Sequence, residues 1–410
     1  MFAGSQNGDD GNTPDIRNKR IGAYRVILLL LAVALFELVV SDYMYTFDGM
    51  SHNDRRGGHI LQTLMQFNKK RRVSIHQSAK ELPLPTKANH TIALMLEKVG
   101  LEVTQELLDQ FPPIDQSSEL YGDEVLIPGL ETCEQYQNAV TLEDRHTGPA
   151  GMFNTGTNLM YDLLHENCKL PNRRFGVIWQ VPWGKHQPLS SKNRNFPKHW
   201  LSVEHEDVLP LVVIKDPLTW MGSMCRNSYS AHWIRTSDHC PNLIKLETDK
   251  VKADKEKEEE FRNIRVGEPI PVSVKYNSTQ ITYHENLVGL WNDYYGAYWK
   301  DPSPKLFVRY EDLLFRPEET ISKVCSCIGG NFSTPGNFHF VKRSAKGNAG
   351  VHHGSSDLVG ALLRYSNAQT RIQAFTPLDL KSAAAELNTE LLDAFHYPIP
   401  EPVELPLAIE

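Results

Sequence analysis

The chain has no excess of positive charge. Its 43 lysines and arginines are outnumbered by 50 aspartates and glutamates, which gives a formal net charge of −7 and a pI near 6.2. A protein that binds nucleic acid over a broad face normally carries a basic surface, so this balance argues against a nucleic-acid partner. Any anion-binding site in the chain must therefore be local.

Long apolar runs are also scarce, and residues 21–40 are the only stretch that could cross a membrane. The uninterrupted apolar part is 26–36, and the charged side chains near its ends can reach water. Basic residues precede the run and acidic residues follow it (Arg17, Lys19, Arg20 and Arg25; Asp42 and Asp48). The positive-inside rule then predicts a cytosolic tail at 1–20 and a lumenal remainder, which is a single-pass type II topology.

A cleaved signal peptide is the alternative for this run, because Ala32-Val33-Ala34 is similar to a processing site. Cleavage there would leave only six strongly apolar residues, at 26–31. The preceding segment is also long and contains three aspartates. Signal peptides usually have a shorter basic start and a longer apolar part, so an uncleaved anchor is favoured.

Cysteine is sparse, and its spacing does not predict a metal site. Six cysteines permit up to three disulfides with undetermined pairing, and buried free thiols are the alternative. Cys325 and Cys327 have no second pair of cysteines or histidines nearby. Glycosylation acceptor triplets begin at Asn89, Asn277 and Asn331, which agrees with a lumenal location.

The pattern of the chain changes near residue 130. Residues 41–130 are predicted to be a stem or linker, with short helices at 91–98 and 101–108. Residues 131–400 alternate strand and helix signals and form the predicted catalytic domain. Within it, 246–268 is dense in lysine and glutamate and reads as a solvated insertion.

Three strands and three helices carry the fold prediction. Apolar runs predict strands at 175–181, 208–214 and 305–310. Helices are expected from the Asp216 cap with Pro217, from Pro317 to Gly329, and over the apolar stripe at 287–298. Composition does not favour a strand at 143–149. Repeated strand–helix units predict a P-loop-like, doubly wound parallel sheet with helices on both faces.

The stretch Gly151-Met-Phe-Asn-Thr-Gly-Thr-Asn158 has the outline of a phosphate-binding loop. Its two glycines let successive N–H groups converge on an anion, and a helix follows whose N-terminus carries partial positive charge. It lacks the lysine and Ser/Thr of a nucleoside-triphosphate loop, since Thr157 and Asn158 occupy those places. A loop of this kind suits a 5′-phosphate group better than a magnesium triphosphate.

Four motifs in this order resemble the sulfotransferase family, over roughly residues 145–350. Gly151–Asn158 resembles the family's 5′-phosphosulfate loop, and Val212–Ser223 resembles its 3′-phosphate strand and helix. Val308–Pro317 resembles a later strand-to-helix segment, and Lys346-Gly347 with Gly350 resembles the late lysine–glycine loop.

The resemblance implies 3′-phosphoadenosine 5′-phosphosulfate as co-substrate, no metal, and a Golgi membrane location with a lumenal catalytic domain. The implied donor-binding residues are Asn154, Thr155, Gly156, Thr157, Asn158, Lys215, Ser223, Lys346 and Gly347. Asn154 departs from the family pattern, which has a basic residue at that place. Lys215 stands where the family has arginine, which keeps the charge and loses the guanidinium fork.

Sulfuryl transfer to a hydroxyl needs a base and a cation. His186 is the predicted base and Lys185 the cation that replaces Asn154, since both follow the strand predicted at 175–181. His165 and His146 are the rival bases. A basic cluster near this segment could line an anionic cleft or be a solvated patch (Arg173, Arg174, Lys192, Arg194 and Lys198).

The acceptor is left open between a glycan or glycoprotein, which is favoured, and a protein tyrosine. Two other function classes also remain. One is a nucleotide-binding module that has lost turnover, with Asn154 as the lesion. The other is a phosphotransferase, against which the missing loop lysine argues. Association into a homodimer is left open as well.

Overall fold

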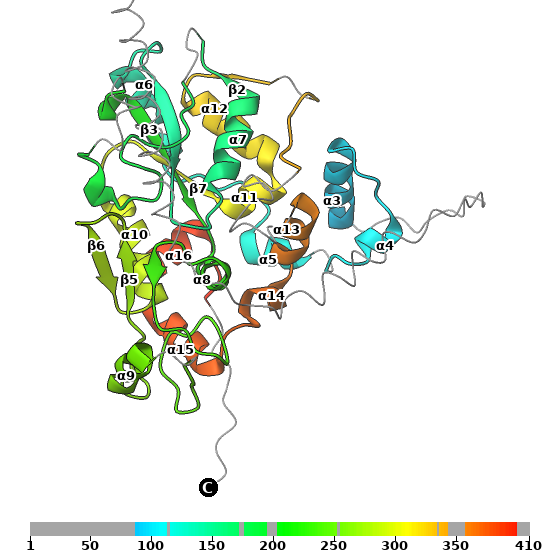
Figure 1. The fold of residues 1–410 in the computed structure, drawn as a ribbon. Helices are drawn as coiled ribbons and strands as arrows, with labels where there is room; N and C mark the ends of the chain where they lie inside the picture. The colour runs from blue at the N-terminus through cyan, green and yellow to red at the C-terminus, as the bar shows by residue number, and fades with distance from the viewer. Residues whose placement is uncertain are drawn as a thin grey trace, which may run out of the picture. The chain divides into compact units, whose positions relative to one another are not determined.

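Strand β3 (Val208–Ile214) is the centre of the main sheet in the computed structural model of this chain (Figure 1). It pairs in parallel with β1 (His146–Ala150) and with β7 (Leu306–Arg309). All residues of the three strands are buried. Because the pairings are parallel, the C-terminal ends of the strands lie at one edge of the sheet. The prediction of a mixed α/β fold with a parallel sheet is confirmed.

The structure describes residues 87–112, 115–171, 176–194, 203–251, 255–333, 336–342 and 357–399, which belong to one compact unit that begins at Pro83. The predicted tail (1–20), anchor (21–40) and first part of the stem lie outside these residues, as do Lys346 and Gly347. In the described part, no helix is both long enough and apolar enough to span a membrane.

The two faces of the sheet pack into two different apolar cores. Val212 and Ile214 belong to one core, and Leu211 and Val213 belong to the other. The first face is covered by α8 (Pro217–Arg226), α10 (Leu287–Lys300), α15 (Pro377–Glu386) and α16 (Thr389–Phe395). The second is covered by α6 (Cys133–Ala139), α7 (Thr157–Asn167) and α12 (Pro317–Cys327). The predicted helices on both faces are present.

The strand predicted at 175–181 is wrong as a regular strand. Its described part runs beside β1 with a single parallel bridge, between Val177 and Thr147. Pro149 of β1 has no N–H group to donate, so the ladder cannot continue regularly. The segment at 143–149, which composition does not favour as a strand, supplies most of β1. Its partner β3 pairs with all five residues from His146 to Ala150.

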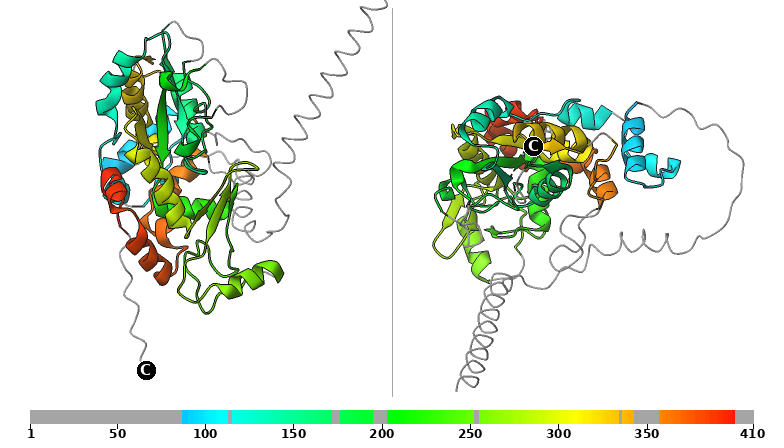
Figure 2. Two further views of the ribbon diagram at one scale, coloured as in Figure 1. Left: turned by 90° about the vertical axis from the view of Figure 1, so that its left-hand side faces the viewer. Right: turned by 90° about the horizontal axis from the view of Figure 1, so that it is seen from above.

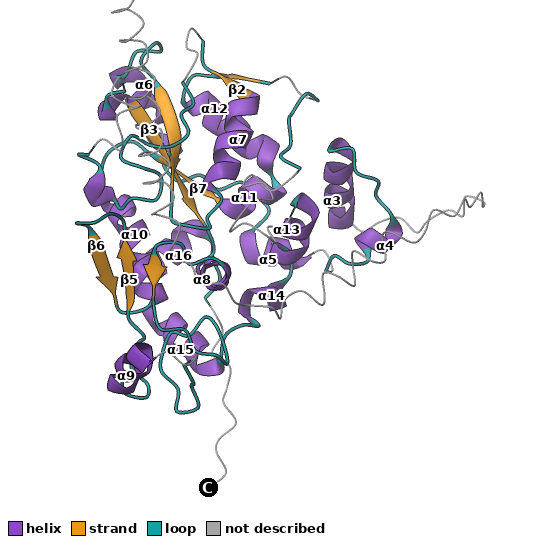
Figure 3. Cartoon of the chain, in the orientation of Figure 1, coloured by secondary structure: helices purple, strands orange, loops and turns teal. Residues whose placement is uncertain are grey.

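The remaining elements lie around this sheet (Figures 1 and 3). A separate antiparallel sheet contains β4 (Ala231–His232), β5 (Val272–Lys275) and β6 (Ile281–His284), and β2 (Cys168–Lys169) pairs with β8 (Asn331–Phe332). The other helices are α3 (Lys87–Lys98), α4 (Gln105–Leu108), α5 (Asp115–Tyr121), α9 (Lys255–Asn263), α11 (Tyr310–Phe315), α13 (Leu358–Tyr365) and α14 (Ala368–Ile372), with short 3₁₀ turns η1 (Leu130–Thr132), η2 (Leu189–Ser191) and η4 (His205–Asp207).

The predicted charged insertion contains α9, which lies at the edge of the compact unit (Figure 2). It is mostly solvated, and its one apolar side chain, Phe261, packs with Ile234 and Ile270. The region predicted as stem contains α3, whose residues Met95 and Leu96 pack with Leu362 of α13.

All six cysteines form disulfides, which pair Cys133 with Cys327, Cys168 with Cys325, and Cys225 with Cys240. Disulfides form and persist in oxidising compartments. The three bonds therefore indicate an extracellular or lumenal domain.

Candidate functional site

The loop at 151–156 joins the C-terminal end of β1 to α7. Gly156 has a φ of 87°, and a Cβ at this position would lie 2.4 Å from Cδ2 of Tyr310, so both the backbone and its neighbour require glycine. Gly156 is also the N-cap of α7, and no side chain caps this helix end. The first turn of α7 therefore presents backbone N–H groups and the positive end of the helix dipole, as an anion site needs.

The polar side chains of the loop mainly fix its shape. Thr155 is fully buried, and its hydroxyl donates to the carbonyl of Met152 at 2.8 Å. Asn154 has a φ of 64°, which asparagine tolerates better than most residues. Its Nδ2 donates to the carbonyl of Asn227 at 2.7 Å and lies 3.4 Å from that of Ser223. Asn154 thus fastens the loop to the C-terminal end of α8.

Lys215 and Ser223, the residues implied to hold the 3′-phosphate, contact each other. Lys215 follows β3, and Asp216 caps α8 by accepting from the N–H of Thr219 at 2.9 Å. Two turns into α8, the hydroxyl of Ser223 accepts from Nζ of Lys215 at 3.0 Å. The two residues predicted to hold one phosphate are therefore in direct contact, on the strand next to the loop.

Three residues that the sequence did not single out complete this cluster. Nη2 of Arg226 donates to the Ser223 hydroxyl at 2.9 Å, and Nζ of Lys215 donates to the hydroxyl of Tyr365 at 2.6 Å. Nζ of Lys215 also lies 4.5 Å from the ring centre of Tyr310. Arg226 lies one helical turn after Ser223 and could have been found from that spacing. Tyr365 is 150 residues from Lys215 and has no local signal.

Burial and charge shift the pKa values in this cluster. Burial lowers the pKa of Lys215, against the opposing effect of Tyr365, and burial also lowers that of Arg226. Burial raises the pKa of Tyr365, but the charges of Lys215 and Arg226 outweigh it and bring the value to about 8. The buried Lys215 and Tyr365 therefore share one site with Arg226, an exposed residue of α8.

A buried network of hydrogen bonds and one ion pair surrounds Asp216, at the C-terminal end of β3. The N–H of Asp216 donates to Oε1 of Glu311 at 3.1 Å, and the hydroxyl of Tyr397 donates to Oε2 at 2.9 Å. Nε of Arg371 lies 2.8 Å from Oδ2 of Asp216. Burial, with the nearby charge of Asp216 as a second cause, raises the pKa of Glu311 to about 7. These contacts hold the N-terminus of α8, and with it Ser223, against β7 and α11.

Lys185 and His186 both lie at the loop. Nζ of Lys185 donates to Oδ1 of Asn158 in the first turn of α7, at 2.5 Å. Nδ1 of His186 lies 2.8 Å from the carbonyl oxygen of Gly151, and its ring centre is 4.9 Å from that of Phe153. A carbonyl only accepts, so Nδ1 carries the proton. A neutral His186 ring is then unprotonated at Nε2, which is the state a base needs.

The rival histidines lie elsewhere. His146 is the first residue of β1 and is buried, at the opposite end of that strand from the loop. His165 lies eight residues after Thr157, about 12 Å along α7 at the usual rise per residue. Its half-exposed ring lies next to Glu166. Of the three predicted candidates, the structure brings His186 to the loop.

An aromatic strip adjoins Lys185. Nζ of Lys185 lies 3.7 Å from the ring centre of Trp179, which is 37% exposed. Tyr161 packs edge-on against Trp179 at 5.1 Å, and His165 stacks on Tyr161 at 5.2 Å. The strip (Trp179, Tyr161 and His165) runs from the loop along the solvent side of α7. Sequence reasoning missed the two larger aromatics, whose meeting depends on the packing of two segments.

Of the predicted basic cluster, the structure describes Lys192 and Arg194, which make separate contacts. Lys192 donates to Ser303 at 2.9 Å, and Arg194 donates to Gln280 at 2.9 Å. Arg173, Arg174 and Lys198 lie outside the described residues. The described ranges contain no group of three or more His, Cys, Asp or Glu side chains arranged to hold a metal ion.

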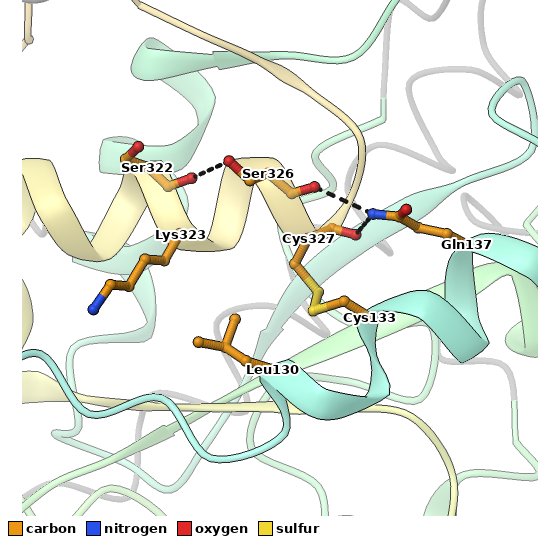
Figure 4. A pocket seen from close by; sticks show the side chains of 7 residues that line it. All are labelled: Leu130, Cys133, Gln137, Ser322, Lys323, Ser326 and Cys327. Carbon is orange, nitrogen blue, oxygen red and sulfur yellow. Dashed lines mark hydrogen bonds between the residues drawn. A yellow bond between two sulfur atoms is a disulfide. The ribbon is translucent and has the colours of Figure 1, made fainter.

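A pocket lies over the Cys133–Cys327 disulfide, between η1, α6 and α12 (Figure 4). Its lining residues are Leu130, Cys133, Gln137, Ser322, Lys323, Ser326 and Cys327. None of them belongs to the loop or to the Lys215 cluster, so this pocket has no part in the candidate site.

No model of a known protein family matches the chain, and no curated protein matches it. The functional inference therefore depends on the geometry of the site and on the resemblance of its motifs.

Proposed function

We propose that this chain is a sulfotransferase that transfers a sulfuryl group from 3′-phosphoadenosine 5′-phosphosulfate to a hydroxyl group of a glycan. The observation that carries the proposal is the pairing of two anion-binding elements at one edge of the sheet. The loop follows β1, the Lys215–Ser223 pair follows the adjacent β3, and Asn154 links the loop to α8. Ligands of open α/β sheets bind at this edge.

Each phosphate of the donor has a place in this arrangement. The 5′-phosphosulfate would lie against the loop and the N-terminus of α7, with Thr157 and Asn158 in the first turn. The 3′-phosphate would be held by Lys215 and Ser223, with Arg226 as a third group. Charge-assisted hydrogen bonds of this kind are about twice as strong as neutral ones. Lys346 and Gly347 stay predicted donor-binding residues.

The chemistry needs no group beyond those at the loop. His186 would take the proton from the acceptor hydroxyl as that oxygen forms a bond to sulfur. The bond between sulfur and the bridging 5′-phosphate oxygen breaks, and 3′-phosphoadenosine 5′-phosphate leaves. Lys185 would stabilise the negative charge that develops on the bridging oxygen.

The aromatic strip supports a glycan as the acceptor. Sugar rings present C–H faces that pack on exposed aromatic rings, and Trp179 is exposed and lies next to Lys185. A tyrosine peptide would need a path to the same base, and its acceptance is an outcome of the assay below. The proposed setting is a Golgi membrane with the catalytic domain in the lumen. Asn277 and Asn331 are exposed, so glycosidase treatment should increase gel mobility.

Binding and transfer assays together test the proposal. The chain should bind 3′-phosphoadenosine 5′-phosphate in the absence of magnesium, and ATP with magnesium should not compete. It should then transfer sulfate to members of a panel of glycans. Binding without transfer to glycans or tyrosine peptides would instead support an inactive nucleotide-binding module. Competition by ATP with magnesium would contradict the donor assignment.

Two variants locate the 3′-phosphate. Lys215→Met should weaken binding of 3′-phosphoadenosine 5′-phosphate by about 10-fold or more, and Ser223→Ala by about 5-fold, on the usual scale of charged and neutral hydrogen bonds. Adenosine 5′-phosphosulfate lacks the 3′-phosphate and should be affected less. Equal losses for both nucleotides would place the 3′-phosphate elsewhere.

A further inference from the structure

The Lys215–Ser223 pair is closed to solvent. The exposed fraction is 1% for Lys215 and 5% for Ser223. The Ser223 hydroxyl accepts from both Lys215 and Arg226 and donates to the carbonyl of Thr219 at 2.9 Å. Its hydrogen-bonding capacity is therefore used, so Ser223 can donate to a phosphate only by releasing the carbonyl of Thr219. Arg226 is exposed, but a phosphate that binds the buried ammonium of Lys215 must replace another partner of that group.

That partner is Tyr365. Its hydroxyl accepts from Nζ of Lys215 at 2.6 Å, and its ring centre lies 4.2 Å from the same ammonium. Tyr365 is the last residue of α13, and Ser366 ends the helix. The hydroxyl thus supplies an oxygen to Lys215 at the point where a phosphate oxygen would be expected.

We propose that Tyr365 is an exchangeable partner of Lys215 in the donor site, whose hydroxyl holds the place of the 3′-phosphate until a nucleotide that carries this phosphate displaces it. The inference rests on the proposed function, because it takes Lys215 and Ser223 as the 3′-phosphate site. A nucleotide without a 3′-phosphate brings no anion to replace the phenol, so it gains nothing from this exchange. The exchange therefore offsets part of the affinity that the 3′-phosphate contributes, and it leaves the binding of nucleotides without this phosphate unchanged.

The surroundings of Tyr365 suit an exchangeable contact. Its ring packs edge-on against Tyr310 of α11 at 5.1 Å, and α13 is held to α3 by apolar side chains. The charged and titratable groups of the neighbouring elements are Lys215 after β3, Arg226 of α8, Tyr310 and Glu311 of α11, Tyr121 of α5, Arg371 of α14 and Arg364 of α13 itself. Among these, the cations Lys215 and Arg226 act most directly on the phenol.

The exchange between the Tyr365 hydroxyl and the 3′-phosphate should make nucleotide affinity depend on pH. Below pH 8 the phenol is mostly neutral and competes with a phosphate dianion only through a hydrogen bond. Above pH 8 the phenolate is favoured beside Lys215 and Arg226, and it competes as a charge. The affinity of the wild type for 3′-phosphoadenosine 5′-phosphate should therefore fall as the pH rises from 7 to 9.

Calorimetric titration of the full chain with 3′-phosphoadenosine 5′-phosphate and with adenosine 5′-phosphate tests the exchange, at pH 7 and pH 9. Tyr365→Phe removes the competing oxygen and keeps the ring. It should bind the bisphosphate about 2- to 10-fold tighter at pH 7, the scale of one hydrogen bond. The gain should be larger at pH 9, and the affinity for adenosine 5′-phosphate should not change.

Tyr136→Phe is the matched control, since it removes a buried tyrosine hydroxyl that contacts the carbonyls of His146 and Asp207 instead of Lys215. It should leave both affinities unchanged. Weaker bisphosphate binding by Tyr365→Phe would make Tyr365 a ligand of the nucleotide. Binding equal to that of the wild type would show that the nucleotide displaces nothing. Either result overturns the inference and leaves the donor assignment intact. If neither wild type nor Tyr365→Phe binds the bisphosphate, both proposals fail. Should Tyr365→Phe not fold, a wild-type affinity that is the same at pH 7 and pH 9 overturns the exchange.

Discussion

Nζ of Lys185 lies 2.5 Å from Oδ1 of Asn158, which brings an ammonium group to the first turn of α7. The loop itself has asparagine at 154, and the amide of that residue points to α8. The cation that a phosphosulfate would meet at this end of the sheet is therefore Lys185. It belongs to the segment that follows the bridge at Val177, and not to the loop. This arrangement keeps a positive charge at the loop without a basic residue in it.

Removal of that charge should slow the reaction and weaken donor binding. Lys185→Met keeps most of the aliphatic stem and loses the ammonium group, which should reduce turnover by about 10- to 100-fold, the effect of 1.4–2.8 kcal/mol of lost charge stabilisation. Donor affinity should also fall, since in the proposed site this charge would face the sulfuryl oxygens before transfer. Lys192→Met is the matched control, because Lys192 contacts Ser303 instead of the loop. Equal turnover in both variants would contradict the role of Lys185.

Replacement of His186 should separate catalysis from binding. His186→Asn can still donate to the carbonyl of Gly151, but it has no basic nitrogen. Turnover should fall by about 100-fold or more, the usual scale for loss of a general base, with little change in affinity for 3′-phosphoadenosine 5′-phosphate. The wild-type rate should also fall at acid pH as the imidazole is protonated. If His165→Asn abolishes turnover and His186→Asn does not, the base is wrongly assigned.

Local signals predicted much of this structure. The apolar run at 208–214 forms β3 with the predicted bounds, and the Asp216 cap and Pro217 begin α8 where expected. Pro317 begins α12, and the stripe at 287–298 is buried in α10. Each of these features depends on residues within one or two turns or on a continuous apolar segment, so the sequence contains the whole signal.

Features that depend on distant partners could not be predicted in the same way. β1 forms from an unpromising sequence because β3 provides a complete ladder for it. Tyr365 and Trp179 reach the site only through the packing of α13 and of the 176–185 segment. Lys215 and Ser223 are assigned to one phosphate from the resemblance, and their contact is local, since both positions belong to one strand–helix unit. Tyr365, which contacts Lys215, lies 150 residues away in the sequence, so no local spacing could predict that contact.

The disulfides should differ in their effect on stability. The Cys133–Cys327 bond closes a segment with a sequence separation of 194, and the Cys225–Cys240 bond one of 15. With the Cys168–Cys325 bond intact, the first bond closes a loop of only about 40 residues, made of 133–168 and 325–327. In the chain-entropy account, loops of about 40 and about 15 residues stabilise the fold by about 4 and about 3 kcal/mol. Replacing both cysteines of a pair by serine should therefore lower the denaturant midpoint more for the first pair. A larger loss for Cys225 and Cys240 would show that local packing at the end of α8 outweighs loop length.

Glu311 should make stability depend on pH. Its pKa is raised by burial, and further by Asp216, to about 7 in the folded chain, against 4.5 as the ordinary value. Well below pH 4.5 the carboxyl is protonated in both states. As the pH rises from 4.5 to 7, the unfolded chain loses this proton first, so the free energy of unfolding falls. Above pH 7 the full loss of unfolding free energy is present, about 3 kcal/mol.

Glu311→Gln keeps the shape of the side chain and cannot ionise. The difference in unfolding free energy between this variant and the wild type, measured by urea denaturation at pH 5, 6, 7 and 8, should shift in favour of the variant as the pH rises. A difference that stays constant over this range would mean that Glu311 does not hold its proton in the folded state.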